Sequence, residues 1–119
     1  MRGERRARIG AASRALLCSL AGLASIVSAA RAGDAGHGKV LSARCIACHG
    51  PAGHSDDPMV PDLAGQHGIY LYRQLQEFKA GTRKNPLMSP VAHALADSDM
   101  DDLATYYAGL VPQGQANTR

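Results

Sequence analysis

The chain has 119 residues, of which 45% are hydrophobic, 19% charged and 4% aromatic, with a formal net charge of +3. This length suits one domain, and 13 Gly with 6 Pro are too few for a collagen-like or disordered chain. The positive charge is concentrated in residues 1–32, which hold six of the 13 basic residues and one acid. Residues 33–119 carry seven basic and nine acidic groups, which argues against a basic nucleic-acid-binding protein.

Residues 1–32 have the composition of a secretory signal peptide. An arginine-rich start precedes sixteen uncharged residues, ALLCSLAGLASIVSAA, and such signals combine a basic region, an apolar region and small residues at the cut. Ala30-Arg31-Ala32 predicts cleavage before Gly33, with a cut after Ala30 as the alternative. Sixteen residues are fewer than the about 20 that span a bilayer. We therefore favour export to the periplasm over a retained membrane anchor.

The exported domain, residues 33–119, then has two cysteines, because Cys18 leaves with the signal. They lie in Cys45-Ile46-Ala47-Cys48-His49, and C-x-x-C-H is the attachment signature of a c-type haem. If this segment is helical, the cysteines and the histidine project from one face within one turn. Two thiols can then bond the two vinyl groups on one haem edge, while the imidazole reaches the iron.

Three other uses of the motif are open. A thioredoxin-type C-x-x-C follows a strand and opens a helix, whereas here the motif closes a helical stretch. A zinc site would recruit His54 or His67, but a histidine directly after Cys48 matches no common finger spacing. A disulfide across two intervening residues is strained. We prefer one covalent haem per chain, since the motif occurs once.

The exported domain is predicted to contain helices joined by loops, with no alternating strand pattern. The helices are predicted from residue 34 or 35 to 47, over about 68–80, and from Ser98, whose S-x-x-D pattern with Asp101 is a capping box. One Phe, four Tyr and no Trp make a thin core, which a bound porphyrin would complete. The apolar stripes are Leu71, Tyr72, Leu75 and Phe78 in the second helix, and Met100, Leu103, Ala104, Tyr107 and Leu110 in the third.

The second iron ligand distinguishes an electron carrier from a haem with an open site. Met88 lies in Asn85-Pro86-Leu87-Met88-Ser89-Pro90, between the second and third helices, where a loop can wrap the far face of the ring. Thioether ligation favours reduced iron. Met59 lies on the His49 side and Met100 on a core face, so we favour Met88. The alternatives to Met88 are His93 and His67.

The domain resembles class I c-type cytochromes, in particular the bacterial cytochrome c-four subgroup and its single-haem relatives. The resemblance implies an all-α fold in which three main helices wrap around one covalently attached haem. The matching segments are Gly38-Lys39-Val40, Cys45-x-x-Cys48-His49-Gly50, Pro61-Asp62-Leu63-Ala64-Gly65-Gln66, Tyr70-Leu71-x-x-Gln74-Leu75-x-x-Phe78-x-x-Gly81-x-Arg83, Asn85-Pro86-x-Met88, and Asp99, Leu103, Ala104, Tyr106 and Tyr107.

The resemblance also implies roles for individual residues. Cys45 and Cys48 would bond haem c, and His49 and Met88 would be the axial iron ligands. The Pro61 carbonyl would accept the proton of the His49 Nδ1 and so orient the ring. The two-haem relative repeats this unit, whereas the present sequence has one copy, and a homodimer or a larger multihaem partner would supply the second half.

With both axial positions filled, no site is open for a small-molecule substrate. We therefore expect a one-electron carrier rather than an enzyme, exchanging electrons with a membrane-bound oxidase, a cytochrome complex or a periplasmic reductase. Lys79, Arg83 and Lys84 either steer an acidic partner or are simply the solvated end of a helix. Two alternatives stay open: a haem subunit of a dehydrogenase or reductase complex, and a haem enzyme or sensor with a displaceable methionine.

Overall fold

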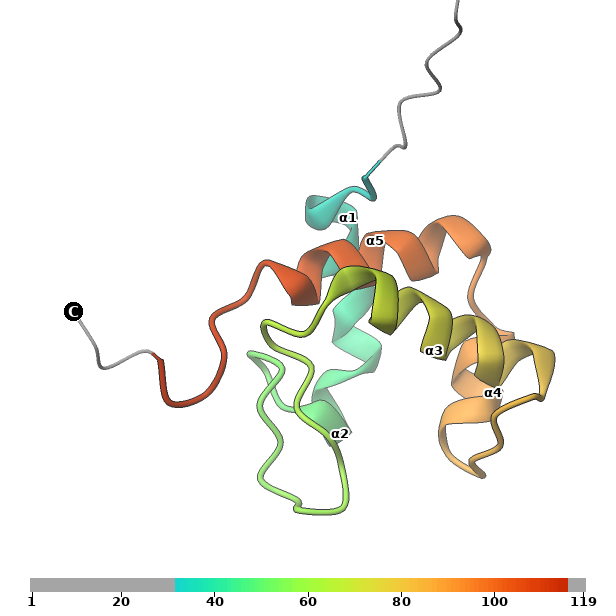
Figure 1. Ribbon diagram of the computed structural model, residues 1–119, viewed down its shortest axis with the longest axis horizontal. Helices are drawn as coiled ribbons and strands as arrows, with labels where there is room; N and C mark the ends of the chain where they lie inside the picture. The colour runs from blue at the N-terminus through green and yellow to red at the C-terminus, as the bar shows by residue number, and fades with distance from the viewer. Residues whose placement is uncertain (1–31, 116–119) are drawn as a thin grey trace, which may run out of the picture.

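The computed structural model describes residues 32–115, and within them every regular element is a helix (Figure 1). Apart from Ala32, the predicted signal peptide lies outside the described residues. None of the described helices is both long and apolar enough to cross a bilayer. The elements are α1 (Ala35–Leu41), the 3₁₀ turn η1 (Ser42–Arg44), α2 (Ile46–His49), α3 (Gly68–Ala80), α4 (Met88–His93) and α5 (Asp97–Ala108).

The first predicted helix begins where expected but is divided into three pieces. Asp34 caps it, because its Oδ1 accepts hydrogen bonds from two amides of the first turn, at 2.8 and 3.1 Å. The continuous helix predicted to residue 47 is wrong: α1 ends at Leu41 and a 3₁₀ turn follows. The Ser42 hydroxyl donates to the Lys39 carbonyl (2.7 Å), a local bond of the kind that bends helices.

The second predicted helix is confirmed, and the third is confirmed except at its start. α3 has the predicted bounds. α5 begins at Asp97, with Ala96 at the cap position in place of Ser98. The Asp99 carboxylate accepts a hydrogen bond from the Ala96 amide (3.0 Å). The predicted pairing of Ser98 with Asp101 is therefore wrong, because the carboxylate two residues earlier closes the first turn.

The short helix α4 was not predicted, and it lies in the stretch expected to be a loop. Asn85 stabilises the turn that leads into α4, because its Oδ1 accepts hydrogen bonds from the amides of Leu87 (2.8 Å) and Met88 (2.9 Å). The Asn85 amide in turn donates to the Ser89 hydroxyl (3.1 Å). Met88 is thus the first residue of a helix, held by the Asn85 turn that precedes it, rather than part of an unconstrained loop.

α5 is central to the packing, because it contacts both α1 and α3, and α4 packs against α3 (Figure 1). The predicted apolar stripes face this centre, and Met100 is fully buried, as expected for a methionine with a packing role. The buried cluster consists of Leu71, Leu95, Met100, Leu103, Ala104 and Tyr107.

Two contacts join α1 to α5. At Gly38 the helices approach so closely that a Cβ would lie 2.1 Å from the Asp102 carbonyl oxygen and 2.9 Å from the Tyr106 Cβ. One residue earlier, the His37 Nδ1 lies 2.7 Å from the Asp102 carboxylate. A residue without a side chain and an ion pair therefore fix this crossing.

Gly38→Ala tests the close approach of α1 to α5. We expect a loss of about 1–3 kcal/mol of stability, the usual effect of overpacking, measured by urea unfolding followed by circular dichroism. Gly109→Ala is the control, because the nearest atom to a Cβ there is 3.5 Å away and its φ is −81°. Equal stability of the two variants would contradict the crossing at Gly38.

The His37–Asp102 pair predicts a pH-dependent stability. Hydrogen bonding to Asp102 raises the pKa of His37, with smaller contributions from Asp99 and Asp34, and the bond to His37 lowers the pKa of Asp102. The pair therefore makes its full contribution to stability between the unfolded-state pKa values of Asp and His, at about pH 4 to 6.5. Its contribution falls at higher pH as His37 loses its proton, and at lower pH as Asp102 gains one.

We accordingly expect the difference in Tm between the wild type and His37→Gln to be largest near pH 5 and to shrink by pH 9. His93→Gln, at the exposed end of α4, should show no such dependence. A constant Tm difference for His37→Gln across this range would contradict the ion pair.

Candidate haem-binding site

The two cysteines and the histidine of the motif lie on one turn. The His49 amide donates to the Cys45 carbonyl (2.8 Å), and the Cys48 amide contacts the same carbonyl (3.2 Å). Both cysteines are free thiols; Cys45 is half-buried and Cys48 is exposed. The local backbone therefore presents all three side chains within one turn, as the spacing predicts.

The His49 ring is buried, with 6% of the residue exposed. Its Nδ1 lies 2.8 Å from the Pro61 carbonyl oxygen, and because a carbonyl only accepts, Nδ1 carries the proton. The lone pair of the neutral ring is then on Nε2. This is the contact that the resemblance implies, and it leaves one nitrogen ready to bind a metal.

The segment 50–67 closes back on α2 and so brings Pro61 to His49. The Ser55 hydroxyl donates to the Cys48 carbonyl (3.0 Å), and the Ser55 amide donates to the Asp62 carboxylate (2.7 Å). Further along, the Leu63 amide donates to the Gly53 carbonyl (2.8 Å). The orientation of the imidazole therefore depends on a loop that is held in place by hydrogen bonds to α2 and within the loop itself.

α4 provides the opposite side of the site. Both ribbon views place α2 and α4 apart, on either side of the molecule's lower half in Figure 1. Met88, half-buried at the first position of α4, is held by the hydrogen bond from its amide to Asn85.

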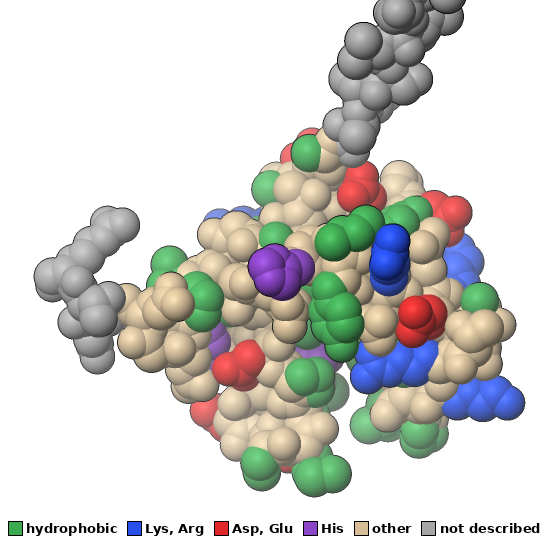
Figure 2. Space-filling model, in the orientation of Figure 1, with side chains coloured by type: hydrophobic (Ala, Val, Ile, Leu, Met, Phe, Trp, Pro, Cys, Tyr) green, Lys and Arg blue, Asp and Glu red, His purple; other side chains and the backbone are tan. Residues whose placement is uncertain are grey.

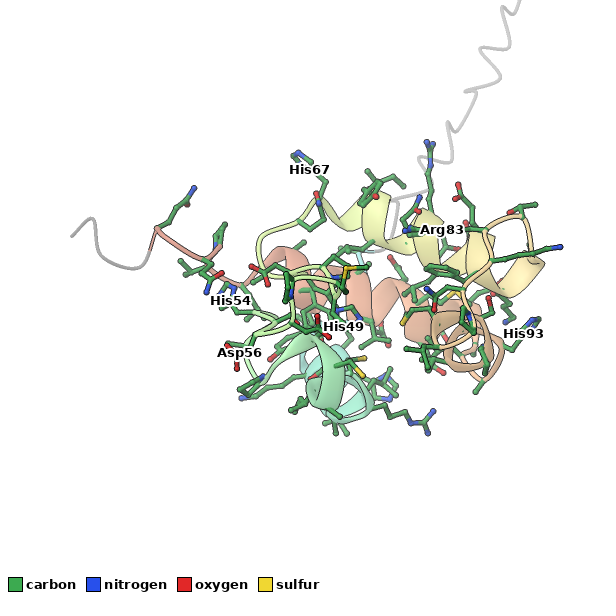
Figure 3. The ribbon with its side chains drawn as sticks, turned by 90° about the horizontal axis from the view of Figure 1, so that it is seen from below. His49, His54, Asp56, His67, Arg83 and His93 are labelled. Carbon is green, nitrogen blue, oxygen red and sulfur yellow. The ribbon has the colours of Figure 1, made fainter. Side chains whose placement is uncertain are left out.

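The other candidate ligands lie elsewhere (Figure 3). His67, directly before α3, and His93, at the end of α4, are both exposed, and both point away from His49. Met59 is 87% exposed on the loop, whereas Met100 is buried in the core. Of these side chains, Met88 alone is both partly buried and on the opposite side of the site.

The space-filling view shows a hollow between the lobe of α2 with its loop and the lobe of α4 (Figure 2). Large apolar side chains are left exposed on both lobes: Met59 on the loop, and Leu87, 71% exposed, beside α4. A flat apolar ring bonded to two thiols and to a nitrogen would cover such surfaces. The chemistry of the donor set and the apolar side chains exposed on both lobes therefore fit a haem.

The alternatives for the cysteine motif lack support in the described structure. Burial raises the pKa of the Cys45 thiol, whereas a redox-active C-x-x-C needs a lowered pKa. Residues 32–115 contain no group of three or more His, Cys, Asp or Glu side chains arranged to hold a metal ion. The zinc interpretation therefore lacks its ligands here, and the thioredoxin interpretation lacks its activated thiol.

Two residues near the site were not singled out from the sequence. Asn85 caps the turn before Met88, and an Asn four residues before a Ser at a helix start was a usable signal. Tyr107 was predicted as an apolar core residue, but its buried hydroxyl has no hydrogen-bond partner in the described structure. Nothing in the sequence pattern distinguishes that hydroxyl from an ordinary core position.

Comparisons with known proteins agree with this geometry. The profile of the cytochrome c family matches residues 35–110. The chain is 40% identical over 80 residues to cytochrome c-554(548) of Halomonas halodenitrificans, covering 65% of this chain and 96% of that protein. It is 43% identical over 77 residues to a thiosulfate dehydrogenase electron acceptor of Stutzerimonas stutzeri (strain A1501), covering 62% of this chain and 34% of that protein.

A solved structure shows the same fold. The crystal structure of reduced recombinant cytochrome c4 from Pseudomonas stutzeri superposes with a TM-score of 0.64 at 40% identity, covering 67% of this chain and 47% of that chain. The chain spans about a third to a half of the length of its cytochrome c4 relatives. The helical fold, the C-x-x-C-H turn and the family profile together show that this chain belongs to the cytochrome c family, in which haem c is bound covalently.

Proposed function

We propose that this protein is a one-electron carrier whose haem c is bonded to Cys45 and Cys48 and has His49 and Met88 as axial ligands. The observation that carries the proposal is the bond from the His49 Nδ1 to the Pro61 carbonyl. It leaves the Nε2 of a buried ring free to bind iron, on the turn that also bears both thiols.

Met88 is favoured as the second ligand by its position. It is partly buried on the lobe facing α2, while Met59 is almost fully exposed and Met100 belongs to the core. Pairing of the Asn85 side chain with the Met88 amide fixes the backbone next to the sulfur. A ligand fixed in this way needs little rearrangement when the iron changes its charge.

Haem c supplies the Fe(III)/Fe(II) couple. The chain's own residues orient the ligands and exclude water: His49 is held by Pro61, Met88 by Asn85, and the core of α3 and α5 covers the inner side. With both axial positions filled by side chains, a substrate has no place to bind, which favours transfer to another protein over catalysis.

Partners are redox proteins that dock briefly through small polar interfaces: a membrane-bound oxidase, a cytochrome complex or a periplasmic reductase. Basic side chains gather beside α3 and α4 (Figure 2), but two of them serve the fold. Lys79 donates to the Leu95 carbonyl (2.7 Å), and the Arg83 guanidinium stacks on Phe78 at 4.5 Å. Arg83 and Lys84 are both exposed, and their charges would steer an acidic partner.

A second candidate is a haem subunit of a dehydrogenase complex. The similarity to a protein named as a thiosulfate dehydrogenase electron acceptor favours it. Both candidates place the mature chain in the periplasm, after removal of the predicted signal peptide, residues 1–32. Isolation of the protein from the native periplasm, alone or together with a dehydrogenase, separates the two; a homodimer would appear as a doubled mass in the first case.

Covalent attachment is tested by intact mass. We expect the secreted wild type to carry one haem that survives acidified organic solvent, because thioether bonds do not dissociate. The double variant Cys45→Ala with Cys48→Ala should yield bare polypeptide. Cys18→Ala, in the predicted signal, is the control and should keep the haem. The same spectrum reports whether the mature chain begins at Gly33 or Arg31, and bare wild-type polypeptide would overturn the proposal.

The second ligand is tested by visible spectroscopy. We expect six-coordinate low-spin bands and the weak long-wavelength iron–thioether band in the oxidised wild type. Met88→Ala should abolish that band and lower the midpoint potential, because thioether ligation favours Fe(II). Met59→Ala, on the exposed loop, should change neither. A high-spin ferrous wild type that binds carbon monoxide readily would indicate a haem enzyme or sensor instead.

A further inference from the structure

Tyr107 carries a polar group in the middle of the core. The residue is 4% exposed, and its hydroxyl oxygen is fully shielded from solvent without a hydrogen-bond partner in the described structure. Buried hydroxyls are nearly always paired in folded proteins. An unpaired hydroxyl at this depth therefore indicates a partner that forms in the complete molecule.

The sulfur of Cys45 is the candidate hydrogen-bond acceptor for the Tyr107 hydroxyl. Cys45 packs against the cluster that contains Tyr107. Burial raises the pKa of the Cys45 thiol, and the Tyr107 hydroxyl acts in the opposite direction, as a donor toward a negative sulfur does. The hydroxyl thus approaches this sulfur without forming a bond to the free thiol.

Ser42 is the other hydroxyl that influences Tyr107. Its proton is already donated to the Lys39 carbonyl (2.7 Å), so toward Tyr107 it could only accept. The described structure shows no hydrogen bond from the Tyr107 hydroxyl to Ser42, so the hydroxyl hydrogen of Tyr107 lacks an acceptor there.

The Tyr107 ring cannot move away from this position. A Cβ on Gly53 would lie 3.0 Å from its Cδ1, so the loop backbone lies directly against the ring. The Gly65 amide also donates to the Tyr107 carbonyl (2.9 Å). Because the phenolic oxygen lies on the ring axis, ring flips leave it in place, and only its hydrogen can rotate.

Haem attachment changes the chemistry of the sulfur. When the thiol adds across a vinyl group, sulfur bonds one vinyl carbon and its hydrogen passes to the other, so no oxidant or reductant is consumed. The sulfur then has lone pairs and no hydrogen, and can only accept. We propose that the Tyr107 hydroxyl donates a hydrogen bond to the Cys45 sulfur in the haem-loaded protein and thereby favours the reduced state.

This inference rests on the proposed attachment of haem through Cys45. A donor directed at the sulfur withdraws electron density from the ring edge, which stabilises Fe(II) relative to Fe(III). Tyr107 is thus a positioning residue that acts through the thioether rather than on the iron.

The test compares Tyr107→Phe with Tyr106→Phe in the secreted, haem-loaded protein. Tyr106 is the matched control, because its ring lies 5.1 Å from that of Tyr107 on the same helix. We expect Tyr107→Phe to lower the Fe(II)/Fe(III) ratio at a fixed potential about threefold, equal to a midpoint shift of about 28 mV for one electron. Its Tm should also fall, whereas Tyr106→Phe should leave the midpoint potential unchanged.

Two outcomes of this comparison would overturn the inference. If the hydroxyl is unpaired, Tyr107→Phe removes a desolvated polar group and leaves Tm equal or higher, with the midpoint unchanged. That outcome, or an equal midpoint shift in Tyr106→Phe, overturns the inference while haem binding and the proposed function stand. A wild type without haem instead overturns the proposed function, and the inference with it.

A measurement on the wild type keeps the proposal testable if Tyr107→Phe fails to fold. In the reduced, diamagnetic protein, the Tyr107 hydroxyl proton should exchange slowly and show a nuclear Overhauser contact to the Cys45 β protons. A contact to the Ser42 side chain in its place would assign the bond to Ser42 and overturn the proposal.

Discussion

The hydrogen bond between the His49 ring and the Pro61 carbonyl is the interaction on which the site depends. It joins the last residue of α2 to a loop residue twelve positions later, across 2.8 Å. This bond fixes which ring nitrogen keeps its proton, and therefore which one can bind a metal. The loop contacts through Ser55 and Gly53 serve the same end, since they return the chain to the turn that bears the thiols.

The rest of the fold supports that turn with few large side chains. The chain has one Phe, four Tyr and no Trp, and its core is built around α5. Where α1 crosses α5, Gly38 has no side chain, so the two helices pack in direct contact without large side chains between them. Large apolar side chains stay exposed on both lobes. In a cytochrome c, the covalently bound porphyrin adds apolar surface to a small core, so the cofactor is both the redox centre and a structural element.

Charged residues in the described part of the chain serve the fold as well as the surface. Lys79 joins α3 to the start of α5, where its Nζ lies 3.3 Å from the Asp97 carboxylate, and Arg83 covers Phe78. His37 pairs with Asp102 between α1 and α5. Basic residues that stand close together in the sequence, such as Lys79 and Arg83, therefore hold the fold together as well as carrying charge.

The sequence by itself determined the all-α class, the bounds of α3 and the one turn that combines Cys45, Cys48 and His49. These features can be predicted from residue spacing. Apolar residues that recur with the helical period indicate a helix, and residues three and four positions apart lie on the same helix face. The break after α1, the helix at Met88 and the start of α5 were missed, since each depends on which side chain wins a local hydrogen bond. The contact of Pro61 with His49 was expected from the family resemblance and not from residue spacing, and it forms through loop closure. Only the tertiary structure brought the Tyr107 hydroxyl toward Cys45, because the packing of α5 decides contacts between residues distant in the chain.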